Sequence, residues 1–199
     1  MTTHAATAQA AHLGEQGMSR GMFGMVLFIA SEIMLFGGLF AGYFYMRNQA
    51  ASWPPEGVHE VDPVTGGILT AILVISGLSA HMGVVGAKAG NQGLFIFGLA
   101  GALLLGTIFI GGQIYEWFLL MDHGLTAESG VYGSSFYVLT GFHGAHVIVG
   151  LAMLLVVFIR GFWRDFTPKR HLFVDASVLY WHFVDIVWVF LYAALYVLV

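Results

Sequence analysis

The chain contains no cysteine, and only 9% of its 199 residues are charged. The absence of cysteine excludes a disulfide framework and any metal site built on thiolates. Soluble domains usually carry about 25% charged residues, so this chain has too few to cover a folded surface exposed to water. Seven Lys and Arg residues, spread along the chain, do not make a basic surface for nucleic acid. The lack of cysteine and the small number of charged residues therefore indicate a membrane protein.

Apolar residues make up 58% of the chain and gather in five long runs. A bilayer-spanning helix needs about 20 mostly apolar residues. We therefore predict five transmembrane helices, over residues 21–46, 64–87, 93–120, 134–159 and 174–199. The four prolines all lie between these spans, as uninterrupted helices require. The expected fold is an all-α, polytopic membrane bundle over residues 19–199, preceded by a flexible polar tail over residues 1–18.

Basic residues predict the orientation of the bundle, because cytoplasmic loops are enriched in Lys and Arg. Six of the seven basic residues lie before the first span or in the second-to-third and fourth-to-fifth connections. They are Arg20, Lys88, Arg160, Arg164, Lys169 and Arg170. The other side has only Arg47, among several acidic residues. We expect a cytoplasmic N-terminus and a C-terminus on the outside.

Glu32 lies about 12 residues past Arg20, which places it ~18 Å along the first span. An ionised side chain at such a depth is costly. No Lys or Arg lies within the spans, so we expect Glu32 to be a neutral, hydrogen-bonding acid. Two roles stay open for it, a proton-holding carboxyl and a packing contact to a neighbouring helix.

Further ionisable side chains inside the spans suggest an intramembrane polar network. They are His81, Glu116, His143, His146, His182 and Asp185. His143 and His146 share a helix face at three residues' spacing, as do His182 and Asp185. Together these four could bind Fe, Zn or Mn. We favour interhelical hydrogen bonds, because a buried histidine pair alone is a weak metal signal. Glu116 stands between Tyr115 and Trp117, in a segment that we interpret as an interfacial aromatic anchor.

The fourth-to-fifth connection is a candidate site for phospholipid headgroups. Its basic residues are Arg160, Arg164, Lys169, Arg170 and His171. Clustered basic residues at the cytoplasmic surface attract anionic lipid by about 1 kcal/mol each. Small residues at i, i+4 spacing, Gly38 with Gly42 and Gly86 with Gly90, permit close helix contacts inside the bundle or toward a partner.

Four segments carry longer motifs: SEIMLFGGLF at 31–40, QIYEW at 113–117, TGFHGAHVIVG at 140–150 and YWHFVDIVW at 180–188. They resemble subunit III of haem–copper cytochrome c oxidases, and the similarity runs from Met22 to the C-terminus. Many members of that family have seven helices, and this chain matches their last five, as in five-helix bacterial forms. The longer relatives form a lipid cleft with their first two helices, which this chain does not match.

The resemblance implies a non-redox accessory subunit of a respiratory terminal oxidase, in the inner (plasma) membrane of a bacterium. No haem, copper or catalytic centre is expected in this chain. Haem and copper would belong to partner subunits, with catalytic subunit I the principal partner, and phospholipid would bind as well. The resemblance also implies that the subunit supports proton uptake by the catalytic subunit, and the family's membrane carboxyl corresponds to Glu32. The alternatives are a quinol oxidase subunit III, an accessory subunit of nitric oxide reductase, a membrane metalloenzyme, and a transporter that relays protons through Glu32.

Overall fold

Polar side chains set the beginnings of the first three helices. Ser19 and Asn91 each accept a hydrogen bond from a backbone amide three residues ahead, at 3.3 and 3.1 Å. Asp62 accepts from two amides and from the hydroxyl of Thr65. These hydrogen bonds hold the pKa of the Asp62 carboxyl below its ordinary value. Such caps satisfy backbone donors that have no partner within the helix.

The structure is a computed structural model that describes residues 19–55, 61–163, 166 and 170–198. Its helices are α2 (Arg20–Gln49), α3 (Pro63–Ala89), α4 (Gln92–Asp122), α5 (Val131–Phe162) and α6 (Leu172–Tyr192). A short π-helix, η1 (Ala193–Val197), continues α6. Each of the five long helices is long and apolar enough to cross a membrane, which confirms the predicted all-α polytopic bundle. The predicted tail over residues 1–18 lies outside the described residues.

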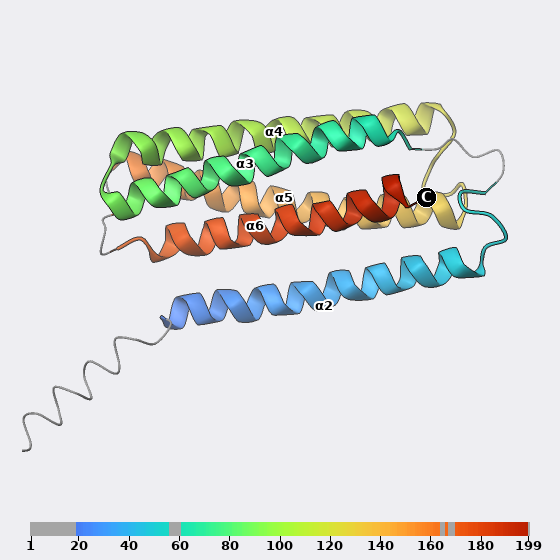
Figure 1. The fold of residues 1–199 in the computed structure, drawn as a ribbon, viewed down its shortest axis with the longest axis horizontal. Coiled ribbons are helices and arrows are strands. Elements are labelled where there is room, and N and C mark those ends of the chain that lie inside the picture. Colours follow the sequence, from blue (N-terminus) through green and yellow to red (C-terminus); the bar gives the residue numbers. More distant parts are fainter. Residues whose placement is uncertain (1–18, 56–60, 164–165, 167–169, 199) are drawn as a thin grey trace, which may run out of the picture.

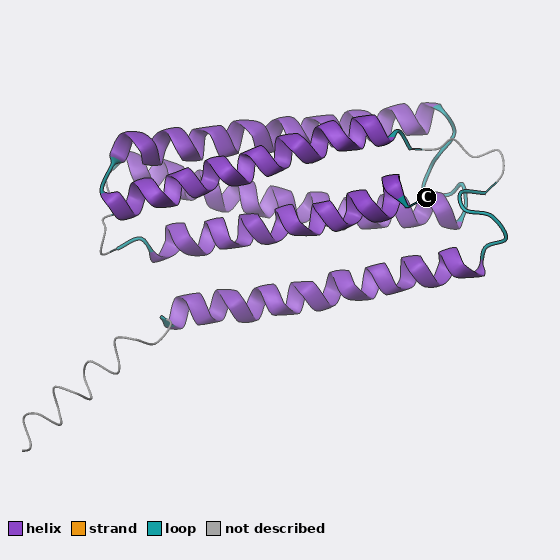
Figure 2. Ribbon diagram, in the orientation of Figure 1, coloured by secondary structure: helices purple, strands orange, loops and turns teal. Residues whose placement is uncertain are grey.

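The helices run antiparallel to their neighbours in the chain and are joined by loops (Figures 1 and 2). The start of α2, the α3–α4 turn and the start of α6 lie at one end of the bundle.

One detail of the prediction was wrong, because Pro63 is the first residue of α3 and does not lie between spans. Proline fits that position since the first amide of a helix needs no partner within it.

Glycines bring α3 and α4 into close contact. A Cβ added to Gly98 would lie 2.7 Å from the carbonyl oxygen of Ser79, and one on Gly86 would lie 2.8 Å from the Cα atom of Phe95. Gly90 has a different role: its φ of 68° makes it the left-handed cap that ends α3. Gly38 and Gly42 have nothing within 4 Å of an added Cβ, so they form no close helix contact within the described residues.

Helix α6 lies at the centre of the bundle. Its two tryptophans are fully buried, and both donate their ring N–H to α3. Trp181 bonds to the Ser76 hydroxyl at 3.1 Å, and Trp188 bonds to the Thr70 hydroxyl at 3.0 Å. Helix α2 is peripheral, with only two buried side chains, and it packs mainly against α5 and α6. Figure 1 shows α2 running along one side of the other four helices.

Candidate functional site

Glu32 and His146 meet between α2 and α5, well inside the membrane-spanning region. The His146 Nε2 atom lies 2.8 Å from Glu32 Oε2, and both side chains are largely buried. The ring of Phe36 packs edge-on against the imidazole, with centroids 5.0 Å apart. This partner was not predicted from the sequence, where only Lys and Arg were considered as possible cations beside Glu32. The two residues are 114 positions apart, so no local motif pairs them.

The other nitrogen of His146 fixes how protons are arranged in this pair. Nδ1 lies 2.6 Å from the carbonyl oxygen of Phe142, which can only accept, so Nδ1 carries a hydrogen. At Nε2, either Glu32 is protonated and donates to the ring, or the ring is protonated and donates to a carboxylate. Without that proton, two acceptors would face each other. The pair is therefore a neutral unit that shares one proton, which suits a low-dielectric environment.

His143 does not share the surroundings of its neighbour His146. Its side chain is completely buried, edge-on to Phe109 at 5.8 Å and tilted against Trp188 at 5.0 Å between ring centroids. Neither ring nitrogen has a hydrogen-bond partner among the described residues. The three-residue spacing places both histidines on the inner side of α5, but they contact different helices.

His182 and Asp185 form a separate group with α3. His182 Nδ1 lies 3.6 Å from Asp185 Oδ2, and Gly77 leaves room for the carboxylate, since a Cβ there would collide with it. The ring of His81 lies 6.2 Å from that of His182. No three His, Cys, Asp or Glu side chains among the described residues are placed to hold a metal ion. His143, His146, His182 and Asp185 therefore do not converge on the metal site considered from the sequence.

Glu116 belongs to a buried cluster near the far end of the bundle. Its Oε2 atom accepts hydrogen bonds from the Gln113 amide at 3.0 Å and from the Tyr196 hydroxyl at 2.8 Å. The π-helix η1 carries Tyr196 into this position. The side chain of Glu116 is only 3% exposed, so the interfacial-anchor interpretation is wrong for this residue. Of its two aromatic neighbours, Tyr115 is exposed, whereas Trp117 is half-buried and donates its ring N–H to the Thr140 hydroxyl at 3.2 Å.

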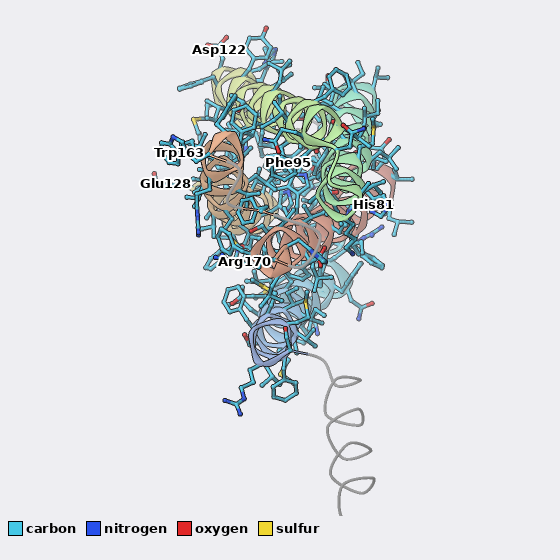
Figure 3. All side chains as sticks on the ribbon, turned by 90° about the vertical axis from the view of Figure 1, so that its left-hand side faces the viewer. His81, Phe95, Asp122, Glu128, Trp163 and Arg170 are labelled. Carbon is cyan, nitrogen blue, oxygen red and sulfur yellow. The ribbon has the colours of Figure 1, made fainter. Side chains whose placement is uncertain are left out.

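The basic connection between α5 and α6 is described only in part. Arg164 and Lys169 lie outside the described residues. The guanidinium of Arg160 lies 5.5 Å from the centroid of the Phe166 ring. Lys88 at the end of α3 lies 3.2 Å from Asp175 in the first turn of α6, so this ion pair joins the two helices. His171, which precedes α6, contacts the same carboxyl at 3.3 Å. Figure 3 views the bundle from this end, with Trp163 and Arg170 labelled, and both residues are exposed.

Comparison with known proteins identifies relatives along almost the whole chain. The family model for cytochrome c oxidase subunit III matches residues 3–199. A protein of Corynebacterium diphtheriae named cytochrome c oxidase subunit 3 is 41% identical over 180 residues, which are 87% of this chain and 85% of the relative. A protein of the same name from Synechocystis sp. is 42% identical over 184 residues, 89% of this chain and 75% of the relative. A protein of the same name from Equus caballus is 38% identical over 180 residues, which are 87% of this chain and 68% of the relative.

Proposed function

The chain belongs to the cytochrome c oxidase subunit III family, and on this premise we propose that it is a non-redox accessory subunit of a respiratory haem–copper terminal oxidase. It stabilises the catalytic subunit of aerobic electron transport and supports that subunit's proton uptake. The observation that carries this function is identity of about 40% to proteins of that name over most of the chain. The names of these relatives favour neither a quinol oxidase nor a nitric oxide reductase.

The proposed partners are the catalytic subunit I, other oxidase subunits and phospholipid, in the inner (plasma) membrane of a bacterium. Haem and copper belong to the partner subunits in this assignment. Within this chain we propose that Glu32 and His146 support proton uptake, because the 2.8 Å contact between the carboxyl oxygen and Nε2 allows them to share one proton. Arg160 and Arg170 are the described candidates for contact with anionic headgroups, since both lie at the end where the α5–α6 connection emerges.

Co-purification tests this function directly, because an accessory subunit has no reaction of its own to assay. We expect the affinity-tagged chain, extracted in mild detergent, to bring down a larger multi-span subunit whose reduced spectrum shows haem. Elemental analysis should find iron and copper in that complex. The isolated chain should contain neither in stoichiometric amount. Recovery of the chain without any haem protein, from cells that respire aerobically, would contradict the assignment.

We further propose that the N-terminus is cytoplasmic, from the distribution of basic residues. The chain has no cysteine, so single cysteines report on topology without background. Ala89, at the α3–α4 turn, and Glu128, between α4 and α5, are both exposed. In intact spheroplasts an impermeant maleimide should label Glu128→Cys and spare Ala89→Cys, and permeabilisation should make the two equally reactive. The opposite pattern would invert the proposed topology.

A further inference from the structure

Two imidazoles point out of the bundle at the depth of the hydrocarbon. His81 on α3 is exposed, and the side chain of His182 on α6 is 37% exposed. Figure 3 shows His81 at the periphery of the bundle, away from Phe95 at its centre. His81 precedes the end of α3 by eight residues and His182 follows the start of α6 by ten, so both lie about 12–15 Å from the same end of the bundle.

This depth is inside the apolar layer of a bilayer. Helix α3 has 27 residues and is about 40 Å long, whereas the hydrocarbon core is about 30 Å thick. A position about 12 Å from the helix end therefore lies below the headgroups. The residues around His81 on the same face are apolar, with Leu78 64% and Val85 46% exposed. Lipid chains offer no hydrogen bond to an imidazole at such a position.

The described part of this chain leaves these rings incompletely bonded. No described residue forms a hydrogen bond to His81, and the ring of His182 lies 6.2 Å from its ring. His182 directs Nδ1 toward Asp185, and no described residue forms a hydrogen bond to its Nε2 atom. Asp185 Oδ1, which is buried, also has no hydrogen-bond partner within the described ranges. Unbonded polar groups at this depth normally face another protein element, because facing lipid is costly.

We propose that the α3–α6 face carrying His81 and His182 is a docking surface for a transmembrane helix of another oxidase subunit. That helix presents a hydroxyl or carboxyl group at the depth of the two imidazoles. The partner's identity as an oxidase subunit rests on the proposed function, whereas the surface itself rests on the exposed rings. A second copy of this chain would present imidazole to imidazole and leave the same groups without complementary charge.

The groove beside this face indicates whether a helix or a lipid occupies the surface. It has a volume of about 670 Å³, lies between α2 and α6, and His182 is the one polar side chain among the residues that line it. An acyl chain would fill an apolar groove but would leave His182 and His81 unbonded. A helix with a polar side chain can satisfy the imidazoles and cover the apolar rim at the same time. The two imidazoles therefore favour a transmembrane helix over a lipid acyl chain as the occupant of this surface.

Photocrosslinking in the intact complex tests the surface. Benzoylphenylalanine at Leu78, one turn before His81, should give a covalent adduct with another oxidase subunit in native membranes. The same probe at Leu104 on α4, also 64% exposed, is the matched control and should not give that adduct. Adducts with lipid alone at Leu78, or the same protein adduct at equal yield from Leu104, would overturn the proposal.

Substitution of His81 provides an independent readout. His81→Leu should lower retention of the chain in the detergent-washed complex by about 3- to 10-fold, the range expected for one interhelical hydrogen bond. His81→Gln, which keeps donor and acceptor groups, should restore retention, and Met82→Leu on the same face should not change it. Unchanged retention in His81→Leu would contradict the surface. A wild-type chain that fails to co-purify with any haem protein would instead refute the proposed function.

Discussion

Replacing Gly98 by alanine should destabilise the chain by about 1–3 kcal/mol, the usual cost of forcing an extra carbon into a packed interior. The added Cβ would collide with the Gly83 backbone and lie 2.7 Å from the carbonyl oxygen of Ser79. These are backbone atoms, so no side chain can rotate away to relieve the contact. Ser79 also donates its hydroxyl to the Gly98 carbonyl at 2.9 Å, and separation of the helices would weaken that bond.

The measurement is the unfolding midpoint of the purified chain in an SDS titration followed by circular dichroism. Gly111→Ala is the matched control in the same helix, because nothing lies within 4 Å of an added Cβ there. The control should unfold at the wild-type midpoint or slightly above it, since alanine favours helix more than glycine does. Equal midpoints for both variants would show that α3 and α4 are not in such close contact.

Replacing Glu32 by alanine should loosen α2 from the bundle, because it removes the hydrogen-bond partner of His146 Nε2. An orphaned, largely buried polar group costs about 1–3 kcal/mol. The effect should be large for α2, since only Phe36 and Tyr43 of that helix are buried. We expect the complex that carries Glu32→Ala to lose this chain at lower detergent concentration than the wild-type complex, with unchanged haem spectra.

Glu32→Gln separates the hydrogen bond from the proton. The glutamine amide can donate to Nε2, so assembly and haem spectra should be preserved. Glutamine cannot hold or release a proton, so turnover at high pH or the active lifetime of the oxidase should fall if the pair supports proton uptake. Infrared difference spectra of wild type against Glu32→Gln should contain a carboxyl or imidazolium band that the variant lacks. If glutamine and alanine loosen the chain equally, the hydrogen bond is not what holds α2.

The five membrane helices were predictable because long apolar runs are a strong signal that does not depend on tertiary contacts. The boundaries were less accurate: α3 begins at Pro63 and α5 at Val131, before the predicted starts at 64 and 134. A helix can continue past the apolar run, because water or a capping side chain can bond to the backbone groups of the residues at its end. Glycine spacing was also ambiguous, since Gly86 packs against α4 while Gly90 ends a helix with a positive φ.

The polar residues could be found from the sequence, but their pairing could not. Helical spacing groups His143 with His146, yet the two side chains differ by about 60° around the helix axis. That difference directs one ring to Trp188 and the other to Glu32. Likewise, Glu116 looks interfacial beside Tyr115 and Trp117, and only the π-helix after α6 shows that Tyr196 meets it. Pairings across many residues depend on how the helices pack, which periodicity does not encode.

The peripheral place of α2 has a consequence for biosynthesis. This helix is the first of the five to leave the ribosome, yet its partners on α5 and α6 are made last. About 100 residues separate the end of α2 from His146, which corresponds to about 5–20 s of translation. During that interval the Glu32 carboxyl is in the bilayer without its imidazole. Ribosome-stalled chains that end before α5 should therefore depend most strongly on a membrane insertase or chaperone that shields α2.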